Sequence, residues 1–325
     1  MKIHFWAIIT LLVSYNSYGQ KNMDSFSYFN SPFPNDTPTL FAEGIISTQF
    51  NELNSSFSPD GNTFLYTVAN NSYSNTFYTI FVSKRVNGKW SKPQIAPFSG
   101  QYSDADPFFS PDGKLIYFIS YRPVDKDMKG KSDFDIWYLS YEKDRFGQPQ
   151  HLGENINSGK DELYPTVSIN GNLYFSTENG ENGYDLMVSK FINKNFEKPE
   201  SISDSINTKA IEFDACISPN ESYIIYTAFG GKGGLGSGDL YISFNENGKW
   251  TSGKNLGSKI NSTFMEQCPA ISPDGKYFFF TSFRDNDNFN YKTTYSTEDY
   301  YKLLQSPLNG MANIFWVKSG MIINR

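Results

Sequence analysis

The chain has 325 residues, of which 17% are aromatic and 38% hydrophobic, and its formal net charge is −6. Aromatic residues suit half-buried pleated strands, so this composition favours a mainly β protein over a helical bundle. The acidic balance and the absence of any run of more than two Lys or Arg exclude nucleic acid as a partner recognised through a basic surface.

The first 19 residues have the pattern of a secretory signal peptide. Lys2 precedes an apolar run over residues 5–13, and the small residues Ser17 and Gly19 stand at the spacing of a cleavage site. The run is too short to cross a bilayer. We therefore predict a cleaved signal over residues 1–19, a mobile leader over residues 20–36, and one mature domain over residues 37–325 that has no transmembrane segment. Such a protein is expected to be periplasmic or extracellular.

A short motif recurs five times, with 50 to 58 residues between successive copies. It reads Ser-Pro-Asp-Gly in three copies and departs from this at Ile169-Asn170 and at Asn220-Glu221. The copies occupy residues 57–61, 109–113, 167–171, 217–221 and 271–275. Proline followed by Asp or Asn and Gly is typical of a tight turn. Because an apolar run precedes each copy and an alternating aromatic run follows it, the motif predicts two strands joined by this turn.

Two further strands follow the turn in the repeat. The third strand is expected at residues 79–83, 135–140, 185–189, 239–243 and 313–317, and the fourth starts near Trp90, Phe146, Phe196 and Trp250. Four strands per unit predict an all-β fold, a β-propeller of four-stranded blades. Five repeats predict five blades, with six blades, one of them degenerate, as the alternative. The last unit lacks a fourth strand, so we expect residues 38–48 to pair beside residues 313–317 and close the ring.

At these motifs the chain resembles the TolB-type, WD-repeat-like propeller family of bacterial envelope proteins. The hallmark of that family is Ser-Pro-Asp-Gly between the first two strands of a blade, and the resemblance covers about residues 37–318. It implies an exported interaction module, and no fused peptidase or peptidoglycan-binding domain is visible in the sequence.

An acidic residue stands six positions before the motif serine in every repeat: Glu52, Asp104, Glu162, Glu212 and Glu266. Asp106 and Asp214 follow two positions later. In a blade the crossover that carries these acids opens on the same face as the loops between the second and third strands, which vary widely in length. One interpretation is that each acid caps backbone N–H groups at its crossover. The other is an anionic ring at the channel mouth that binds a basic group or a cation such as calcium.

Two arginines occupy matching places at the start of these loops. Arg122 and Arg284 each stand two residues after the serine that ends a second strand. They are predicted to pair with the acids, either as part of a binding face or to order the loops.

Catalysis has little support in the residue types. The predicted mature chain has one histidine, His151, so neither a histidine triad nor a His/Cys metal cluster can be assembled. We therefore expect a monomeric binding protein without a resident cofactor, whose partner is a protein, a peptide or a cell-wall component. The alternative is a carbohydrate-active enzyme that uses a carboxylate pair in the central channel.

Two smaller features complete the predictions. Residues 296–304 have a Ser or Thr cap and an acidic first turn, which predicts a helix within the last long loop. Cys216 and Cys268 fall on neighbouring innermost strands but two residues out of step. This stagger places them too far apart for a disulfide, so we expect two free, buried thiols.

Overall fold

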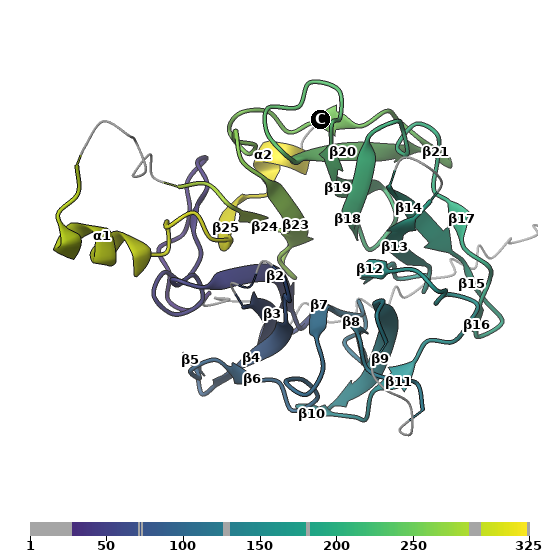
Figure 1. Cartoon of the computed structure of the whole chain (residues 1–325). Helices are drawn as coiled ribbons and strands as arrows, with labels where there is room; N and C mark the ends of the chain where they lie inside the picture. Colours follow the sequence, from purple (N-terminus) through teal and green to yellow (C-terminus); the bar gives the residue numbers. More distant parts are fainter. Residues whose placement is uncertain are drawn as a thin grey trace, which may run out of the picture.

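The computed structural model describes residues 28–70, 72, 74–125, 131–179, 183–285 and 294–323. The predicted signal peptide lies outside the described residues. Five small antiparallel sheets surround a common axis as a five-bladed β-propeller, which confirms the predicted fold (Figure 1). Six blades are not formed.

Each blade uses four strands in order from the axis outward. The innermost strands are β2 (Asn51–Phe57), β7 (Asp104–Phe109), β12 (Glu162–Val167), β18 (Ile211–Ile217) and β23 (Glu266–Ile271). The second strands are β3 (Thr63–Ala69), β8 (Leu115–Ser120), β13 (Leu173–Glu178), β19 (Tyr223–Phe229) and β24 (Tyr277–Ser282). The third strands are β4 (Tyr78–Val86), β9 (Asp135–Glu142), β14 (Tyr184–Ser189), β20 (Asp239–Glu246) and β25 (Asn313–Lys318).

The outermost strands are only two residues long. They are β6 (Gln94–Ile95), β11 (Gln150–His151), β17 (Glu200–Ser201), β22 (Lys254–Asn255) and β1 (Thr39–Leu40). Short hairpin tips precede them in four blades: β5 (Lys89–Trp90), β10 (Arg145–Phe146), β15 (Phe191–Ile192) with β16 (Asn195–Phe196), and β21 (Lys249–Trp250). Short outer strands limit the exposed sheet edge that a second chain could pair with.

The Ser-Pro-Asp-Gly turns form as their residue types predict. In the first copy Ser58 donates its hydroxyl hydrogen to Asp60 Oδ1 at 2.6 Å, and the same hydroxyl oxygen accepts the Thr63 N–H at 2.9 Å. Gly61 has a φ of 69°, in the left-handed region that favours glycine. Glu221 takes a φ of 58° at the matching place in the fourth copy, so that turn closes without glycine.

The hydrophobic core is divided among the interfaces between neighbouring blades. Between the first and second blades, for example, Leu65 and Ile80 pack with Ile116 and Phe118. All four residues are fully buried. Side chains alternate along a strand, so each blade buries apolar residues against both neighbours. The five interfaces together hold the inner strands in a ring.

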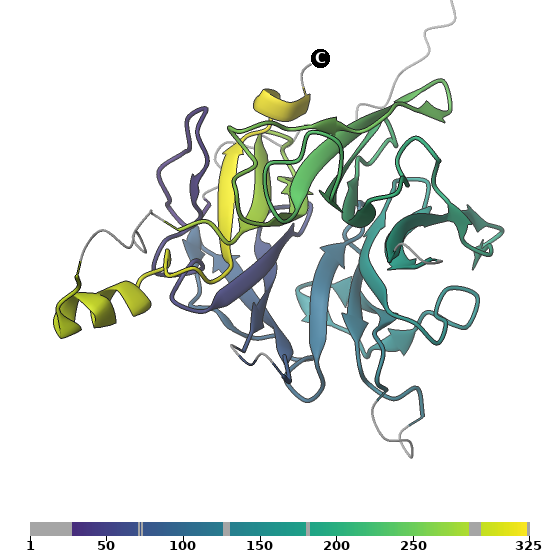
Figure 2. The same cartoon turned by 45° about the horizontal axis from the view of Figure 1, so that its top comes forward.

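The ring closes where the sequence predicts. Thr39 and Leu40 of β1 pair antiparallel with Trp316 and Phe315 of β25. The N-terminal segment thereby supplies the outermost strand of the fifth blade (Figure 2).

The described part of the expected leader, residues 28–36, differs from the prediction. Tyr28 and Phe29 are 2% and 6% exposed and belong to the core between the fifth and first blades. Tyr28 donates to Asp274 Oδ1 at 3.0 Å, and the ring of Phe29 stacks on Trp90 with 4.3 Å between centroids. Burial of these aromatic rings offsets the loss of chain entropy, so this segment is part of the folded domain.

The two helices are short. Helix α1 (Thr297–Leu304) begins at the predicted cap, where Ser296 Oγ accepts the Asp299 N–H, and it projects from the side of the propeller (Figure 1). Tyr301 is 59% exposed and Leu303 is buried. Helix α2 (Gly320–Ile323) follows β25. In the part of the chain that the structure describes, neither helix has the length and apolar character needed to cross a membrane.

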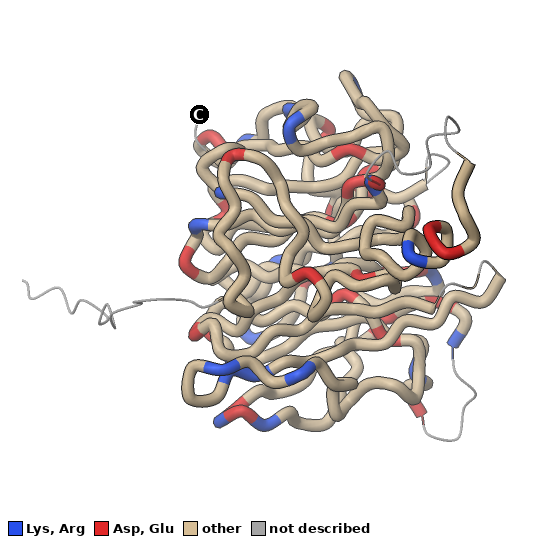
Figure 3. The backbone as a smooth tube through the Cα atoms, turned by 90° about the vertical axis from the view of Figure 1, so that its left-hand side faces the viewer, with Lys and Arg blue, Asp and Glu red and all other residues tan. Residues whose placement is uncertain are grey.

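Charged residues of both signs are interspersed on the side of the molecule drawn in Figure 3.

Candidate functional site

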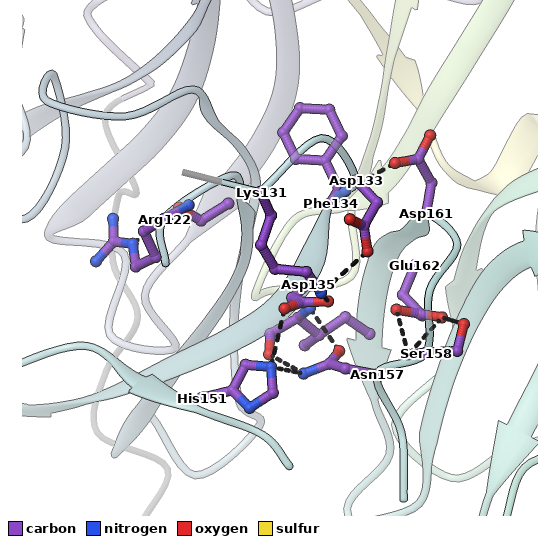
Figure 4. Close-up of polar contacts among 12 residues, drawn as sticks. Arg122, Lys131, Asp133, Phe134, Asp135, His151, Asn157, Ser158, Asp161 and Glu162 are labelled. Atoms are coloured by element: carbon purple, nitrogen blue, oxygen red, sulfur yellow. Dashed lines mark hydrogen bonds and ion pairs between the residues drawn. The ribbon is translucent and has the colours of Figure 1, made fainter. Parts of the chain in front are cut away.

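The five repeat acids do not form an exposed ring. Each stands at or next to the start of an innermost strand, and all five side chains are at most 2% exposed. Glu162 accepts the Ser158 N–H and the Ser158 hydroxyl hydrogen, and Glu212 and Glu266 accept the same pair of groups from Thr208 and Ser262 (Figure 4). Glu52 accepts from both groups of Thr48. Four of the five acids thus cap backbone N–H groups at their crossovers. Asp104 instead accepts from the hydroxyl groups of Ser99 and Ser120 and from Arg122. Because all five are buried and hydrogen bonded, they do not form the exposed anionic ring that was the other interpretation.

The two arginines pair with two of these acids, as predicted. Arg122 donates to Asp104 Oδ1 at 2.7 Å, and Arg284 donates to Glu266 Oε1 at 3.1 Å. Each guanidinium also lies over an aromatic ring, Phe118 at 4.8 Å and Phe280 at 5.3 Å. Because both ion pairs are largely buried, they hold the loops to the crossovers and offer little to a ligand.

The single described histidine belongs to the same kind of structural network (Figure 4). His151 Nε2 lies 3.0 Å from Asp135 Oδ2 and 2.8 Å from Asn157 Nδ2. In the fourth blade Asn255 makes the matching contacts with Asp239 and Asn261. His151 and Asn255 therefore occupy the same place in the repeat, where each side chain links the third strand to the asparagine of the crossover.

The asparagine after each Ile at the crossover has a role that the sequence did not reveal. Asn157 accepts the Ile136 N–H at 2.8 Å and donates to the Ile136 carbonyl at 3.0 Å. Asn207 and Asn261 do the same to Leu186 and Leu240. The side-chain amide thus continues the hydrogen bonds of the outermost strand.

A different ring of residues surrounds the axis. Each innermost strand has a β-bulge, and the residue two positions after the repeat acid has a φ between 50° and 62°. These five residues are Asn54, Asp106, Tyr164, Asp214 and Cys268. A positive φ is costly for residues other than glycine, and it is more tolerable for Asn and Asp than for Tyr or Cys. We call these five residues the axial ring.

Hydrogen bonds connect the axial ring. Asn54 Nδ2 donates to Asp106 Oδ1 at 2.8 Å, and Asp106 Oδ2 accepts the Tyr164 N–H at 3.1 Å. The Cys268 thiol donates to Asp214 Oδ2 at 3.3 Å. These bonds link neighbouring inner strands, from β2 through β7 to β12 and from β18 to β23.

The two carboxyl groups of the axial ring have perturbed acidities. Burial raises the pKa of Asp106 to about 6, although its bonds to Asn54 and Tyr164 act in the opposite direction. Burial and, next in size, the neighbouring charge of Asp106 raise the pKa of Asp214 to about 8. Both carboxyl groups are therefore harder to ionise than in water, and the ionisation of one opposes that of the other.

A cavity of about 290 Å³ lies directly beside the axial ring, toward the Ser-Pro-Asp-Gly turns. All five innermost strands contribute to its walls, and Asp106 and Tyr164 lie on the side of the ring. The walls are formed by prolines, aromatic residues and aliphatic residues, among them Phe57, Pro107, Phe108, Pro165 and Ile217. We call this cavity the funnel. It opens on the face opposite the crossovers, whereas the sequence placed the binding face on the crossover side.

Of the nine residues predicted to bind a ligand, only Asp106 borders the funnel. Asp214 lies in the axial ring, 8% exposed, and the other seven take part in the crossover networks. The sequence missed Asn54, Tyr164 and Cys268, although their position two residues after each acid is the signal that identified Asp106 and Asp214.

Metal ligation has no support among the residues that the structure describes. No group of three or more His, Cys, Asp or Glu side chains is placed to hold an ion there. The calcium ring suggested by the repeat acids would need side chains that are separated in different blades and already hydrogen bonded.

Both cysteines are free and buried, as the stagger of their strands predicts. Burial raises the pKa of the Cys216 thiol to about 12 and raises that of Cys268 as well. Neither thiol is activated as a nucleophile.

Comparisons with known proteins agree on the fold. No family model and no curated protein matches the chain. A solved α-L-arabinofuranosidase from Lactobacillus brevis is similar over 85% of this chain and 92% of that one, with 11% identity and a TM-score of 0.50. A TolB protein from Agrobacterium tumefaciens is similar over 72% of this chain and 70% of that one, with 17% identity and a TM-score of 0.46.

A third solved protein shares a region of similar size. Prolyl oligopeptidase B from Galerina marginata has 13% identity and a TM-score of 0.41, and the similarity covers 73% of this chain but only 31% of that enzyme. At these identities such likenesses extend to the fold and not to the chemistry of a site. The chain is therefore a five-bladed β-propeller, and its own axial ring and funnel are the features that bear on its function.

Proposed function

We propose that this protein is a non-catalytic binding module that takes one or two side chains of a partner polypeptide into the funnel. The observation that carries this proposal is an apolar cavity of about 290 Å³ to which all five blades contribute. Its size is at the lower end of ligand pockets, which fits the end of a peptide or a loop better than a large cofactor.

The walls favour a side chain as the occupant. Anchor residues of protein interfaces typically fill apolar pockets that exclude water, and the contacts around them contribute little energy. The prolines of four turns, Pro59, Pro111, Pro219 and Pro273, also line the funnel, and proline loses little conformational entropy on binding. At the third turn Ile169 is 71% exposed, so the rim offers an apolar surface to the rest of the partner.

A displayed library of random peptides, selected on the protein and sequenced, tests the proposal. Ile169→Asp places a charge at the rim of the funnel, while Ile45→Asp places the same charge on an exposed isoleucine at a crossover, on the opposite face. Peptides that bind the wild type and Ile45→Asp but not Ile169→Asp are expected. A photoreactive phenylalanine at position 169, but not at position 45, should cross-link to them. Equal binding to both variants would place the site elsewhere.

Carbohydrate hydrolysis is the second candidate, and one observation favours it. Asp106 and Asp214 share the axis with pKa values of about 6 and about 8, and glycosidases need one protonated and one ionised carboxyl group. Against it, Asp214 is 8% exposed, is bonded to Cys268 and does not border the funnel.

Assays of oligosaccharide hydrolysis with the wild type, Asp106→Asn and Asp214→Asn separate the two candidates. A catalytic pair would lose activity by about 100-fold or more when either residue becomes an amide. Turnover that both substitutions abolish would replace the binding proposal with the enzymatic one. Glu162 and Glu212 are not tested as such a pair because both are buried as caps of their crossovers.

A further inference from the structure

The charge at the end of the funnel is distinctive. Among the described residues that border the cavity, Asp106 is the one carboxylic acid, and none is Lys, Arg or His. Asp106 also keeps part of its surface accessible, unlike the repeat acids. An occupant of the funnel therefore meets apolar walls and then a single carboxylate.

A second acceptor lies next to this carboxylate. Asn54 is 2% exposed, and its Oδ1 has no hydrogen-bond partner among the described residues. Asn54 Nδ2 donates to Asp106 Oδ1 at 2.8 Å. Because Oδ1 belongs to the same side-chain amide, it lies near the carboxylate. A buried acceptor without a donor costs free energy, which a donor on a ligand would recover.

The other ionisable groups around Asp106 favour their neutral forms. Burial raises the pKa of Asp214, raises that of Tyr78 to about 12, and raises those of Tyr164 and Cys268 well above their usual values. Asp106 is the acid that borders the funnel, so a positive charge on an occupant would pair with it there.

We propose that the funnel selects a side chain with an apolar stem and a cationic donor at its tip, namely a lysine or arginine of the partner polypeptide. The stem packs against Phe57, Pro107, Phe108 and Ile217, and the ammonium or guanidinium donates to Asp106. Asn54 does not border the funnel, so its Oδ1 lies behind Asp106 and would accept only if the tip of the occupant displaced the Asn54 amide. The net charge of −6 also attracts a basic segment from solution. This inference rests on the proposed function, since it assumes that the funnel is the binding site.

End-blocked pentapeptides with a central lysine, arginine, norleucine or glutamate flanked by glycines test the inference. Norleucine is a matched control because it keeps the stem of lysine and lacks the ammonium. Binding is followed by NMR through the labelled methyl groups of Val167, Ile217 and Ala270, which line the funnel. We expect the lysine and arginine peptides to bind about tenfold or more tightly than norleucine, and glutamate not to bind.

The variant Asp106→Asn should reduce the preference for lysine over norleucine to about one, measured as the ratio of the two affinities on the same variant. Wild-type binding of norleucine equal to that of lysine would overturn the cationic selectivity and leave the funnel as a site for apolar side chains. If none of the four peptides shifts the funnel methyl groups, the inference is wrong. The library selection against Ile169→Asp then decides separately whether the funnel is the binding site.

Discussion

Tyr164 on β12 of the third blade donates its phenolic hydrogen to the carbonyl of Pro269 on β23 of the fifth blade, with 2.9 Å between the two oxygens. The fourth blade lies between these two in the ring, so the contact crosses the axis and skips a neighbour. It ties the propeller together from the inside, where the blade interfaces do not reach, and it forms one side of the funnel.

We predict that Tyr164→Phe lowers the free energy of unfolding by about 1 to 2 kcal/mol, since the Pro269 carbonyl loses its donor in a buried place. Denaturant unfolding of the wild type and the variant measures the difference. Tyr301→Phe, which alters a tyrosine that is 59% exposed on α1, is the control and should change stability by less than about 0.5 kcal/mol. Equal effects of the two substitutions would show that the hydrogen bond from Tyr164 to the Pro269 carbonyl does not stabilise the fold.

The ring closure leads to a second prediction. A shortened chain that begins at Glu52 lacks β1 and the buried rings of Tyr28, Phe29 and Phe41, and it exposes the edge of β25 and the faces of Phe64 and Trp316. We expect it to be poorly soluble and to melt at a lower temperature than the full chain.

A chain that begins at Tyr28 is the matched control, because it keeps every described residue of this core. It should melt like the full chain. Unchanged melting of the chain that begins at Glu52 would mean that the fifth blade is stable with three strands.

The sequence predicted the parts of this protein that follow from repetition. The turn motif, the strand order, the five blades and the closure by residues 39–40 could be found because each repeat presents the same turn chemistry and the same alternation of side chains. The ion pairs of Arg122 and Arg284 followed from their matching positions. Membership of the TolB-type family stays a prediction, as do export and the leader before residue 28.

The sequence could not locate the funnel. A β-bulge depends on how two strands pair and not on a residue type, and the axial ring contains Asn, Asp, Tyr and Cys without a glycine to mark the positive φ. The variable loops led us to predict a binding face on the crossover side. The cavity is instead formed by prolines and aromatic residues, which in the sequence look like ordinary strand and turn residues. The repeat acids were conspicuous in the sequence because each forms the same kind of buried hydrogen-bond network at its crossover, and four of the five cap a backbone N–H group there.

The two buried ion pairs provide a graded prediction. The Arg122 side chain is 9% exposed and lies 2.7 Å from Asp104, while that of Arg284 is 20% exposed and lies 3.1 Å from Glu266. Replacing either arginine by methionine keeps much of the stem but leaves a buried carboxylate without its partner. We expect Arg122→Met to lower the free energy of unfolding by about 3 kcal/mol and Arg284→Met by less.

Chemical denaturation of the two variants measures this order. Combining Arg122→Met with Asp104→Asn should recover part of the lost stability, because no charge then remains buried. A larger effect of Arg284→Met, or no recovery in the double variant, would contradict the assignment of these pairs as buried structural contacts.

The last prediction concerns the pH dependence of stability. In the unfolded chain an Asp carboxyl group titrates at about pH 4, whereas in the folded protein Asp214 holds its proton up to about pH 8 because it is buried beside Asp106. Between these pH values the folded state binds more protons than the unfolded state. The free energy of unfolding therefore falls as the pH rises through this window.

Asp214→Asn removes this titration and keeps a side chain that tolerates the φ of 50° at this position. We expect its melting temperature to decrease less than that of the wild type between pH 5 and pH 8, as measured by circular dichroism in buffers of equal ionic strength. Some decrease should remain, because burial also raises the pKa of Glu52 and of Glu162 to about 7 and their titration acts in the same direction. Parallel curves for the two proteins would show that Asp214 is ionised in the folded state at neutral pH, which would contradict the raised pKa assigned to its buried carboxyl group.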